Sequence, residues 1–441
     1  MLRRFIEISA FSPKIEWLLA GGGLNQWADL ESCIKWVWET LPPYRPLALD
    51  YHPQIMVAED LPEELRLMEQ QELVKFNHVW LQSMVGEDNP LREKMALFWH
   101  HHIPSSSGRR PDHGRLLIEE YRKYGLGNLK DLLNAVLSSS TMMWHLDLFS
   151  SHKNNPNENF AREFMELFTL GEGYYSLKDV KEAARALTGR YFDKKSYPYR
   201  ALFDPAIFDD GVKTILGKTG HFGGEEVIEI ILGQAQTARH IARSALRFFF
   251  SDNPPDQMVE SCAEAYYSSG YEMRVLLESM FRHEAFLSPE YNKSKVKTPV
   301  ELLVGFQRQT GLRTVGMKTA YQFLLKCGQV FFYPPTVAGW PGGEDWLRGE
   351  RLLHRLFLPG ALIAIANRQV PKNSLTYKLS SRAFEPSKRR LRYIADAKWD
   401  RGRFYAALNL HGIPVSKWIL GETHSEIELE DCLQHPEYQY C

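Results

Sequence analysis

The sequence has no excess of charge of either sign and no long apolar run. Its 441 residues include 53 lysines and arginines against 54 aspartates and glutamates, so the net charge is -1 with neutral histidines. This balance excludes a bulk positive field that would hold nucleic acid or an anionic membrane. Apolar runs such as Val330 to Tyr333 are far shorter than the ~20 residues that span a bilayer. We therefore expect no nucleic-acid partner and no membrane span.

Cysteine is also scarce. The five cysteines are widely separated and form no CxxC pair, which predicts free thiols and argues against a disulfide framework or a cysteine zinc site; they are Cys33, Cys262, Cys327, Cys432 and Cys441. The N-terminus, Met-Leu-Arg-Arg-Phe-Ile-Glu, has no apolar stretch of ~7 to 15 residues, which a secretory signal needs. We expect a cytoplasmic protein.

Three familiar catalytic and cofactor motifs are missing. There is no GxSxG turn for a hydrolase nucleophile and no GxGxxG after a strand for a dinucleotide. Gly217-Lys218-Thr219 is similar to the end of a phosphate loop, but Val212 stands where the first glycine is required. We therefore expect neither a serine hydrolase nor a dinucleotide-binding fold, and we reject a P-loop.

What the sequence does have is helical periodicity, because apolar residues recur at three and four positions along most of it. Thr298-Pro299-Val300-Glu301 and Ser176-Leu177-Lys178-Asp179 both have the pattern of a capped helix start. Residues 190–224 break the rhythm with Asp209-Asp210-Gly211 between two short extended stretches, which predicts a β-hairpin. The Pro- and Gly-rich residues 333–343 predict a rigid loop.

The fold class expected from these signals is mainly α, a single large helical domain with a small inserted β-hairpin. We divide the chain into a divergent N-terminal helical segment at 1–60, a helical core at 61–369 with the hairpin near 190–224, and a C-terminal helical segment at 370–441. Helices are further predicted over 63–84, 90–100, 129–137, 159–170, 225–232, 237–250, 271–281 and 319–327.

The histidine triplet His100-His101-His102 closes an apolar helix before Pro104. If the helix unwinds there, His100 and His102 lie on one face of an extended segment and can bind one metal ion. The alternative is that one imidazole caps the last carbonyls of the helix and the others are solvated.

A pair of glutamates is the second candidate for chemistry. Glu163 and Glu166 are three residues apart on a helix rich in Phe and Leu, so both carboxylates need a cation or hydrogen-bond donor. Inward-facing carboxylates of this kind hold metal ions in helical bundles, whereas an arginine partner would make them structural. Both interpretations stay open.

Further polar side chains are weaker candidates. Asp209 and Asp210 can serve as carboxylate ligand or base, although Asp-Asp-Gly is more often a turn. Arg243 and Arg247 are four residues apart on one helix face and can clamp a carboxylate or phosphate of the substrate, although such arginines more often pair with acidic residues of the same protein.

The motifs, in their order along the chain, resemble a bacterial family known as domain of unknown function 1800. The resemblance runs over residues 91–102, 145–147, 157–171, 179–189, 209–224, 334–343 and 435–439. Members usually have histidine where this chain has Phe168 and Phe208, and many have a His-Pro pair near Ser139. Many also carry an export signal. The resemblance implies a divergent member whose retained candidates are His100, His102, Glu163, Glu166 and Asp209 or Asp210.

The leading hypothesis is a metal-dependent enzyme, a hydrolase or oxidoreductase acting on a peptide or small molecule. His100, His102, Glu163 and Glu166 would hold a divalent metal, and mixed imidazole and carboxylate ligands suit iron, manganese or zinc. Asp209 or Asp210 would assist. The alternative is a non-catalytic helical scaffold that binds a protein or peptide partner, for which the aromatic residues of the hairpin region offer a surface.

Overall fold

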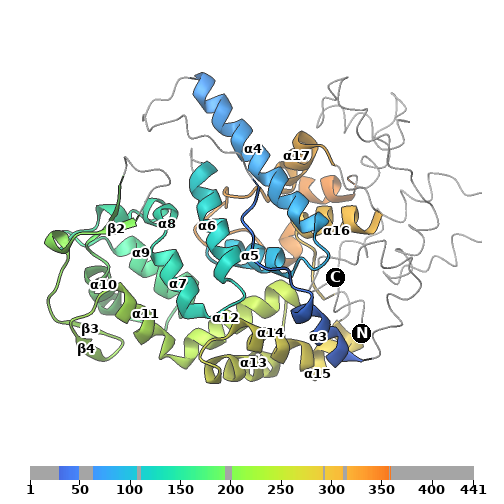
Figure 1. Cartoon of the computed structure of the whole chain (residues 1–441). Helices are drawn as coiled ribbons and strands as arrows, with labels where there is room; N and C mark the ends of the chain where they lie inside the picture. Colours follow the sequence, from blue (N-terminus) through green and yellow to red (C-terminus); the bar gives the residue numbers. More distant parts are fainter. Residues whose placement is uncertain are drawn as a thin grey trace, which may run out of the picture.

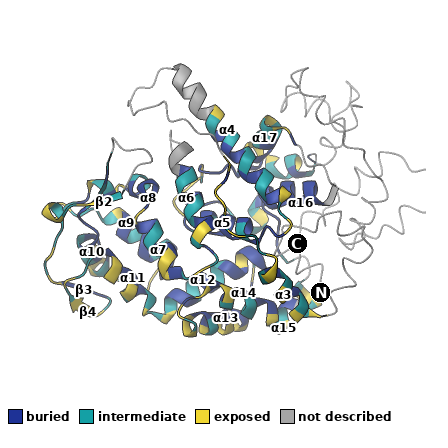
Figure 2. Cartoon of the chain, in the orientation of Figure 1, coloured by how far each residue is buried: buried dark blue, intermediate teal, exposed yellow. Residues whose placement is uncertain are grey.

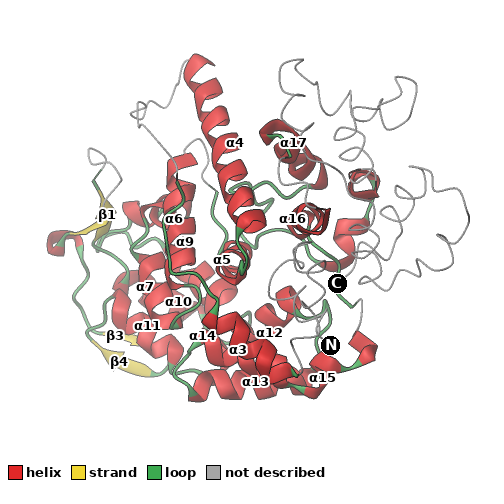
Figure 3. Cartoon of the chain, turned by 45° about the vertical axis from the view of Figure 1, so that its right-hand side comes forward, coloured by secondary structure: helices red, strands yellow, loops and turns green. Residues whose placement is uncertain are grey.

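Helices account for most of the residues that the structure describes, which are 29–48, 63–106, 111–193, 201–291, 294–310, 315–356 and 358 of a computed structural model. They surround a large hydrophobic core, and the two pairs of short strands lie apart from each other on the same side of the molecule (Figures 1 and 3). The predicted mainly-α fold is confirmed. Among the described residues, none of the helices combines the length and the apolar content that a membrane span requires.

Most of the predicted helical ranges are helices in the structure. The α-helices are α3 (Leu30–Glu39), α4 (Glu63–Gly86), α5 (Leu91–His102), α6 (Pro111–Tyr124), α7 (Leu129–Leu137), α8 (Ser140–His145), α9 (Glu158–Glu163), α10 (Leu177–Ala186), α11 (Gly224–Leu232), α12 (Ala235–Phe249), α13 (Asp256–Ser268), α14 (Met273–Arg282), α15 (Glu284–Leu287), α16 (Pro299–Thr310) and α17 (Met317–Cys327). A π-helix, η2 (Phe164–Thr169), follows α9 directly. The 3-10 helices are η1 (Leu148–Ser150), η3 (Pro205–Ile207), η4 (Pro289–Tyr291) and η5 (Gly343–Leu347).

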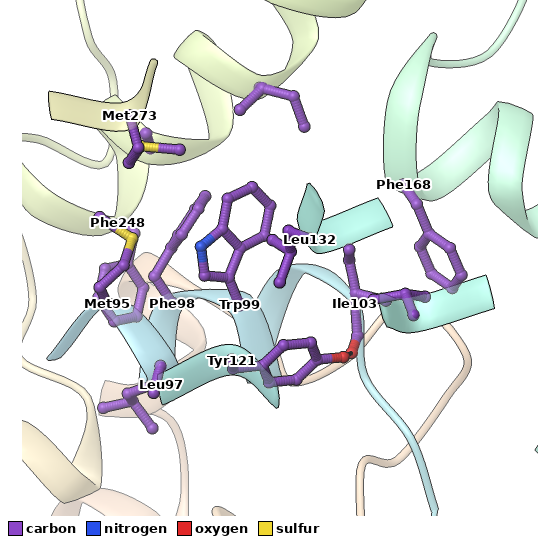
Figure 4. Close-up of a cluster of buried hydrophobic side chains, with 14 of the residues drawn as sticks. Met95, Leu97, Phe98, Trp99, Ile103, Tyr121, Leu132, Phe168, Phe248 and Met273 are labelled. Atoms are coloured by element: carbon purple, nitrogen blue, oxygen red, sulfur yellow. Dashed lines mark hydrogen bonds between the residues drawn. The ribbon is translucent and has the colours of Figure 1, made fainter. Parts of the chain in front are cut away.

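The core is built around α5, which is buried along almost its whole length (Figure 2). Trp99 of this helix is 1% exposed, and its indole N–H donates to the carbonyl of Gly125 after α6. Apolar side chains from α6, α7, α12 and η2 pack in the same cluster (Figure 4). The histidine triplet therefore ends a helix that is locked in the middle of the molecule.

Both predicted capping boxes are confirmed. Ser176 accepts from the backbone N–H of Asp179, and Asp179 accepts from the N–H of Ser176. At α16, Thr298 and Glu301 exchange the same two hydrogen bonds at 3.2 and 2.9 Å. Local side-chain chemistry fixes these helix starts, because each bond satisfies a backbone donor that the first turn leaves free.

The predicted hairpin is two hairpins. Strands β1 (Arg190–Phe192) and β2 (Ala201–Phe203) pair antiparallel, and so do β3 (Lys213–Ile215) and β4 (Lys218–Gly220). The turn of the second is Leu216-Gly217, with φ of 47° and 79°, which matches a tight turn that needs two left-handed residues. Asp209-Asp210-Gly211 is instead the connection between the hairpins. Asp209 and Asp210 therefore do not form the turn of a hairpin, which is where the sequence pattern placed them.

Some of the predicted organisation lies outside the described residues. This applies to the C-terminal segment at 370–441, with Cys432 and Cys441, and to most of the N-terminal segment at 1–60. Cys33, Cys262 and Cys327 are buried free thiols, as predicted. The helix α13 was not predicted, although its buried Met258 and Cys262 have helical spacing.

Candidate functional site

The histidine triplet lies wholly within α5, which continues to His102. The helix does not unwind at the triplet, so the condition under which His100 and His102 would share a face is not met. Residues two apart on a continuous helix point roughly 200° apart, so they do not share a face. His100 and His102 accordingly contact different parts of the molecule.

His100 is fully buried and holds the chain segment that follows α17. The backbone N–H of Phe332 donates to His100 Nε2 across 3.2 Å, and the imidazole ring centre lies 4.9 Å from that of Trp340. Phe332 has a φ of 66°, a conformation that bulky residues rarely adopt. Burial lowers the pKa of His100 to about 3, so the ring is neutral. Because Nε2 accepts, the proton is on Nδ1.

His102 and His240 reach the same π-helix from two other helices. His240 Nε2–H, from α12, donates to the carbonyl of Leu167 at 2.8 Å, and His102 Nε2–H donates to the carbonyl of Phe168 at 3.1 Å. Gln236 adds a hydrogen bond to the carbonyl of Leu170. The last carbonyls of a helix have no partner within it, so these side chains cap η2. Sequence analysis did not predict a role for His240.

The two capping rings are close together and uncharged. Their centres are 5.5 Å apart. Burial, followed by the neighbouring His240, lowers the pKa of His102 to about 3, and burial also lowers the pKa of His240. Two neutral imidazoles thus join α5 and α12 to η2, the helix that carries the predicted Glu166.

Glu163 and Glu166 lie at the junction of α9 and η2 and differ in their surroundings. Glu166 accepts a short hydrogen bond from the hydroxyl of Tyr175. The half-buried carboxyl of Glu163 has a raised pKa, first because of burial and then because of the negative charge of Glu166. Among the described residues, no three His, Cys, Asp or Glu side chains come together as a group that could hold a metal ion. The predicted four-ligand site stays a prediction.

Asp209 is held in place, whereas Asp210 is exposed. Arg185 Nε and Nη2 donate to the two carboxylate oxygens of Asp209 at 2.8 and 3.1 Å, and these bonds lower the pKa of Asp209. Arg185 belongs to α10, and β3 packs mainly against α10 as well. Asp209 is therefore tied to α10.

Arg243 and Arg247 share a face of α12 but not a carboxylate. Arg243 pairs with Asp256 of α13 at 2.8 Å, and the Asp256 side chain is 83% exposed. Arg247 is exposed. One of the two arginines of the predicted clamp, Arg243, is therefore already paired within the protein.

The family model described as protein of unknown function (DUF1800) matches residues 20–440, nearly the whole chain. The chain belongs to the DUF1800 family. The resemblance inferred from the ordered motifs is thereby confirmed. No curated protein and no solved structure matches the chain. The description of the DUF1800 family assigns no activity, so function has to be argued from the residues.

This DUF1800 chain has apolar rings at the two positions where the resemblance led us to expect histidine. Phe168 is 1% exposed and belongs to the cluster that also holds Ile103 (Figure 4). The ring centre of Phe208 lies 5.1 Å from the ammonium of Lys213, whose side chain is fully buried. Neither position offers a metal ligand here, because phenylalanine has no lone pair to donate.

A buried ion cluster was missed entirely. Glu301 Oε2 lies 2.5 Å from Lys295 Nζ, and Glu301 Oε1 lies 3.2 Å from Lys94 Nζ. All three side chains are at most 3% exposed. Burial alone would raise the pKa of Glu301, but the two cations outweigh it and hold the pKa at about 2. The available signal was Lys94 itself, a charged residue directly before the apolar run that starts at Met95.

Proposed function

We propose that this DUF1800 protein is a non-catalytic helical scaffold that presents a rigid apolar loop to a protein or peptide partner. The observation that carries the proposal is a contrast within residues 332–340, a loop whose tip is exposed and whose two ends, its base, are buried. Tyr333 is 47% exposed and Val337 is 41% exposed, whereas Phe332 and Trp340 on either side are buried. Exposed aromatic and aliphatic side chains of this kind are typical of binding surfaces.

The base of the loop is fixed to the histidine segment of α5. His100 holds the backbone of Phe332, as described above. Gly339 has a φ of 89°, and a Cβ at this position would lie 2.6 Å from the carbonyl oxygen of His101. Only glycine therefore lets the loop approach α5 so closely. A loop that is already ordered loses little conformational entropy when it binds.

Polar side chains of the motifs already have partners within the protein, which supports a structural role for the motifs. Asp209 is paired with Arg185, and Glu166 is bonded to Tyr175. In this proposal the family motifs hold the body together, and the loop they support makes the contact with the partner.

The test is the double variant Tyr333→Ser with Val337→Ser, compared with Tyr267→Ser, which removes an aromatic ring that is 40% exposed elsewhere on the surface. Each full-length protein is crosslinked in extract of its own cells, and the crosslinked proteins are quantified by mass spectrometry. We expect the double variant to lose the partner that the wild type and Tyr267→Ser retain, with an unchanged melting temperature. Equal crosslinking of all three proteins would refute the loop as the binding surface.

A metal-dependent hydrolase or oxidoreductase is the second candidate function. It is favoured by Glu163, whose carboxyl has a raised pKa beside Glu166; such groups are used as general acids or bases. Under this proposal one imidazole of the predicted set, that of His100 or His102, joins Glu163 and Glu166 around iron, manganese or zinc, because residues two apart on α5 do not share a face. Metal content of the Glu166→Gln variant, treated in the Discussion, tests it.

A further inference from the structure

The hydrogen bonds of His102 and His240 decide which nitrogen of each ring carries the proton. Both Nε2 atoms face backbone carbonyl oxygens, at 3.1 and 2.8 Å. A carbonyl oxygen only accepts, so each Nε2 must carry the hydrogen, and each neutral ring then has its lone pair on Nδ1. A ring nitrogen that donates to a backbone carbonyl is also the usual arrangement of a histidine whose other nitrogen binds a metal.

The distance between the rings suits a shared ion. Two imidazoles that bind one zinc ion at ~2.0 to 2.1 Å with a tetrahedral angle have ring centres roughly 5 Å apart. The centres of His102 and His240 are 5.5 Å apart. Neutral rings are required for ligation, and burial keeps both of these rings neutral.

Space at the lone pairs is kept open. A Cβ at residue 171 would lie 2.9 Å from His240 Nδ1, and the residue there is Gly171 with a φ of 89°. Neither Nδ1 has a hydrogen bond among the described residues, and neither is a fully buried unpartnered atom, in contrast to Nδ1 of His100 and His101. Both lone pairs therefore reach space that water can enter.

We propose that His102 and His240 form a half-site for a divalent transition metal, bound through both Nδ1 atoms with water in the other positions. Imidazole ligands favour zinc, copper or nickel over magnesium or calcium. This pair differs from the predicted set of His100, His102, Glu163 and Glu166, because it uses α12 in place of the glutamates. It is independent of the loop proposal, which concerns a different surface.

The first test is zinc binding by the untagged full-length protein, followed by isothermal titration calorimetry. His240→Gln removes the ring lone pair but keeps an amide N–H for the carbonyl of Leu167. The control is His221→Gln, which removes an exposed histidine away from the pair. We expect one zinc ion per chain, at least tenfold weaker binding by His240→Gln, and binding within twofold of wild type by His221→Gln. Absence of saturable binding by the wild type, or equal weakening of both variants, would overturn the proposal.

The second test needs no variant. Long-range proton–nitrogen correlation spectra of protein labelled at histidine report the tautomer of each ring. We expect His102 and His240 to be the Nε2–H form, and zinc to shift both Nδ1 resonances and leave that of His221 in place. An Nδ1–H form of either ring, or a zinc shift confined to other histidines, contradicts the half-site even if the variant proteins unfold.

Discussion

The two halves of α5 bury polar side chains in opposite ways. In the first half, Glu93 accepts a two-pronged set of hydrogen bonds from Arg122 at 2.9 to 3.1 Å, and the neighbouring Lys94 faces Glu301 at 3.2 Å. These side chains form ion pairs inside the core. In the second half, His100 is equally buried but neutral, and its Nδ1 has no hydrogen-bond partner among the described residues.

The difference follows from what each side chain does when no counter-charge is available. An ammonium or carboxylate buried alone costs several kcal/mol, so it occurs only with a partner. An imidazole can instead lose its proton on burial, and this costs much less free energy than burying an unpaired charge, because its ordinary pKa is close to pH 7. The first half of α5 is therefore sensitive to loss of a partner, and the second half is sensitive to pH.

Removing the counter-charge of the first half should have the largest effect. Glu301→Gln keeps an acceptor for the N–H of Thr298 but leaves Lys94 and Lys295 without their carboxylate. We expect the free energy of unfolding in urea to fall by about 3 to 5 kcal/mol.

The matched control is Glu260→Gln, which breaks a pair with Arg239 on the surface, where the side chains are 42% and 50% exposed. Exposed pairs of this kind contribute about 0 to 1 kcal/mol. If Glu301→Gln costs no more than this control, the two buried lysines do not depend on Glu301, and the proposed contrast within α5 fails.

The second half of α5 should respond to acid. The pKa of His100 falls from its ordinary 6.5 to about 3 on folding, so between these values only the unfolded chain takes up the proton. Stability is then fully present above pH 6.5 and falls by about 1.4 kcal/mol per pH unit below it, or about 2 kcal/mol at pH 5. His100→Phe keeps a ring and removes the titration. Its unfolding free energy should fall by about 2 kcal/mol less between pH 7 and pH 5 than that of the wild type. Equal falls would mean that folding does not lower the pKa of His100.

Local signals in the sequence predicted much of the helical frame. The range 129–137 was predicted with the bounds that α7 has, and both capping boxes were found from four-residue patterns. These features depend on neighbours along the chain, so the sequence contains them directly. Family membership followed from the order of the motifs.

The candidate site was predicted less well because its contacts are distant in sequence. His240 and Leu167 are 73 residues apart, and His100 and Phe332 are 232 apart. Residues 159–170 were predicted as one helix, but the chain changes to a π-helix at Phe164. No periodicity reports that change, because side chains from α5 and α12 satisfy the carbonyls it leaves free. The unwound helix end that a shared face of His100 and His102 requires is absent for a similar reason, because tertiary contacts along most of α5 keep it helical to His102.

A smaller effect should separate the two proposed functions. Glu166→Gln replaces a charged acceptor for the hydroxyl of Tyr175 with a neutral one. Hydrogen bonds to charged groups are roughly twice as strong as neutral ones, so we expect a loss of about 1 kcal/mol in unfolding free energy. Metal content is measured on untagged protein by mass spectrometry. The scaffold proposal expects no change in metal content, whereas loss of a bound metal from the variant without further destabilisation of the metal-free protein would favour the enzyme.

The smallest effect is expected at Arg243, which lies outside both halves of α5 and provides a baseline for them. Its partner Asp256 is 83% exposed, and water screens such a pair strongly. Helices α12 and α13 are held together by buried apolar side chains such as Ile241, Val259 and Cys262. Arg243→Ala should therefore change the unfolding free energy by at most about 0.5 kcal/mol, and 1 M salt should reduce even that difference. A loss above 1 kcal/mol that persists in 1 M salt would show that a surface pair on α12 contributes as much as a partly buried one. The contrast drawn from α5 would then not extend to the rest of the protein.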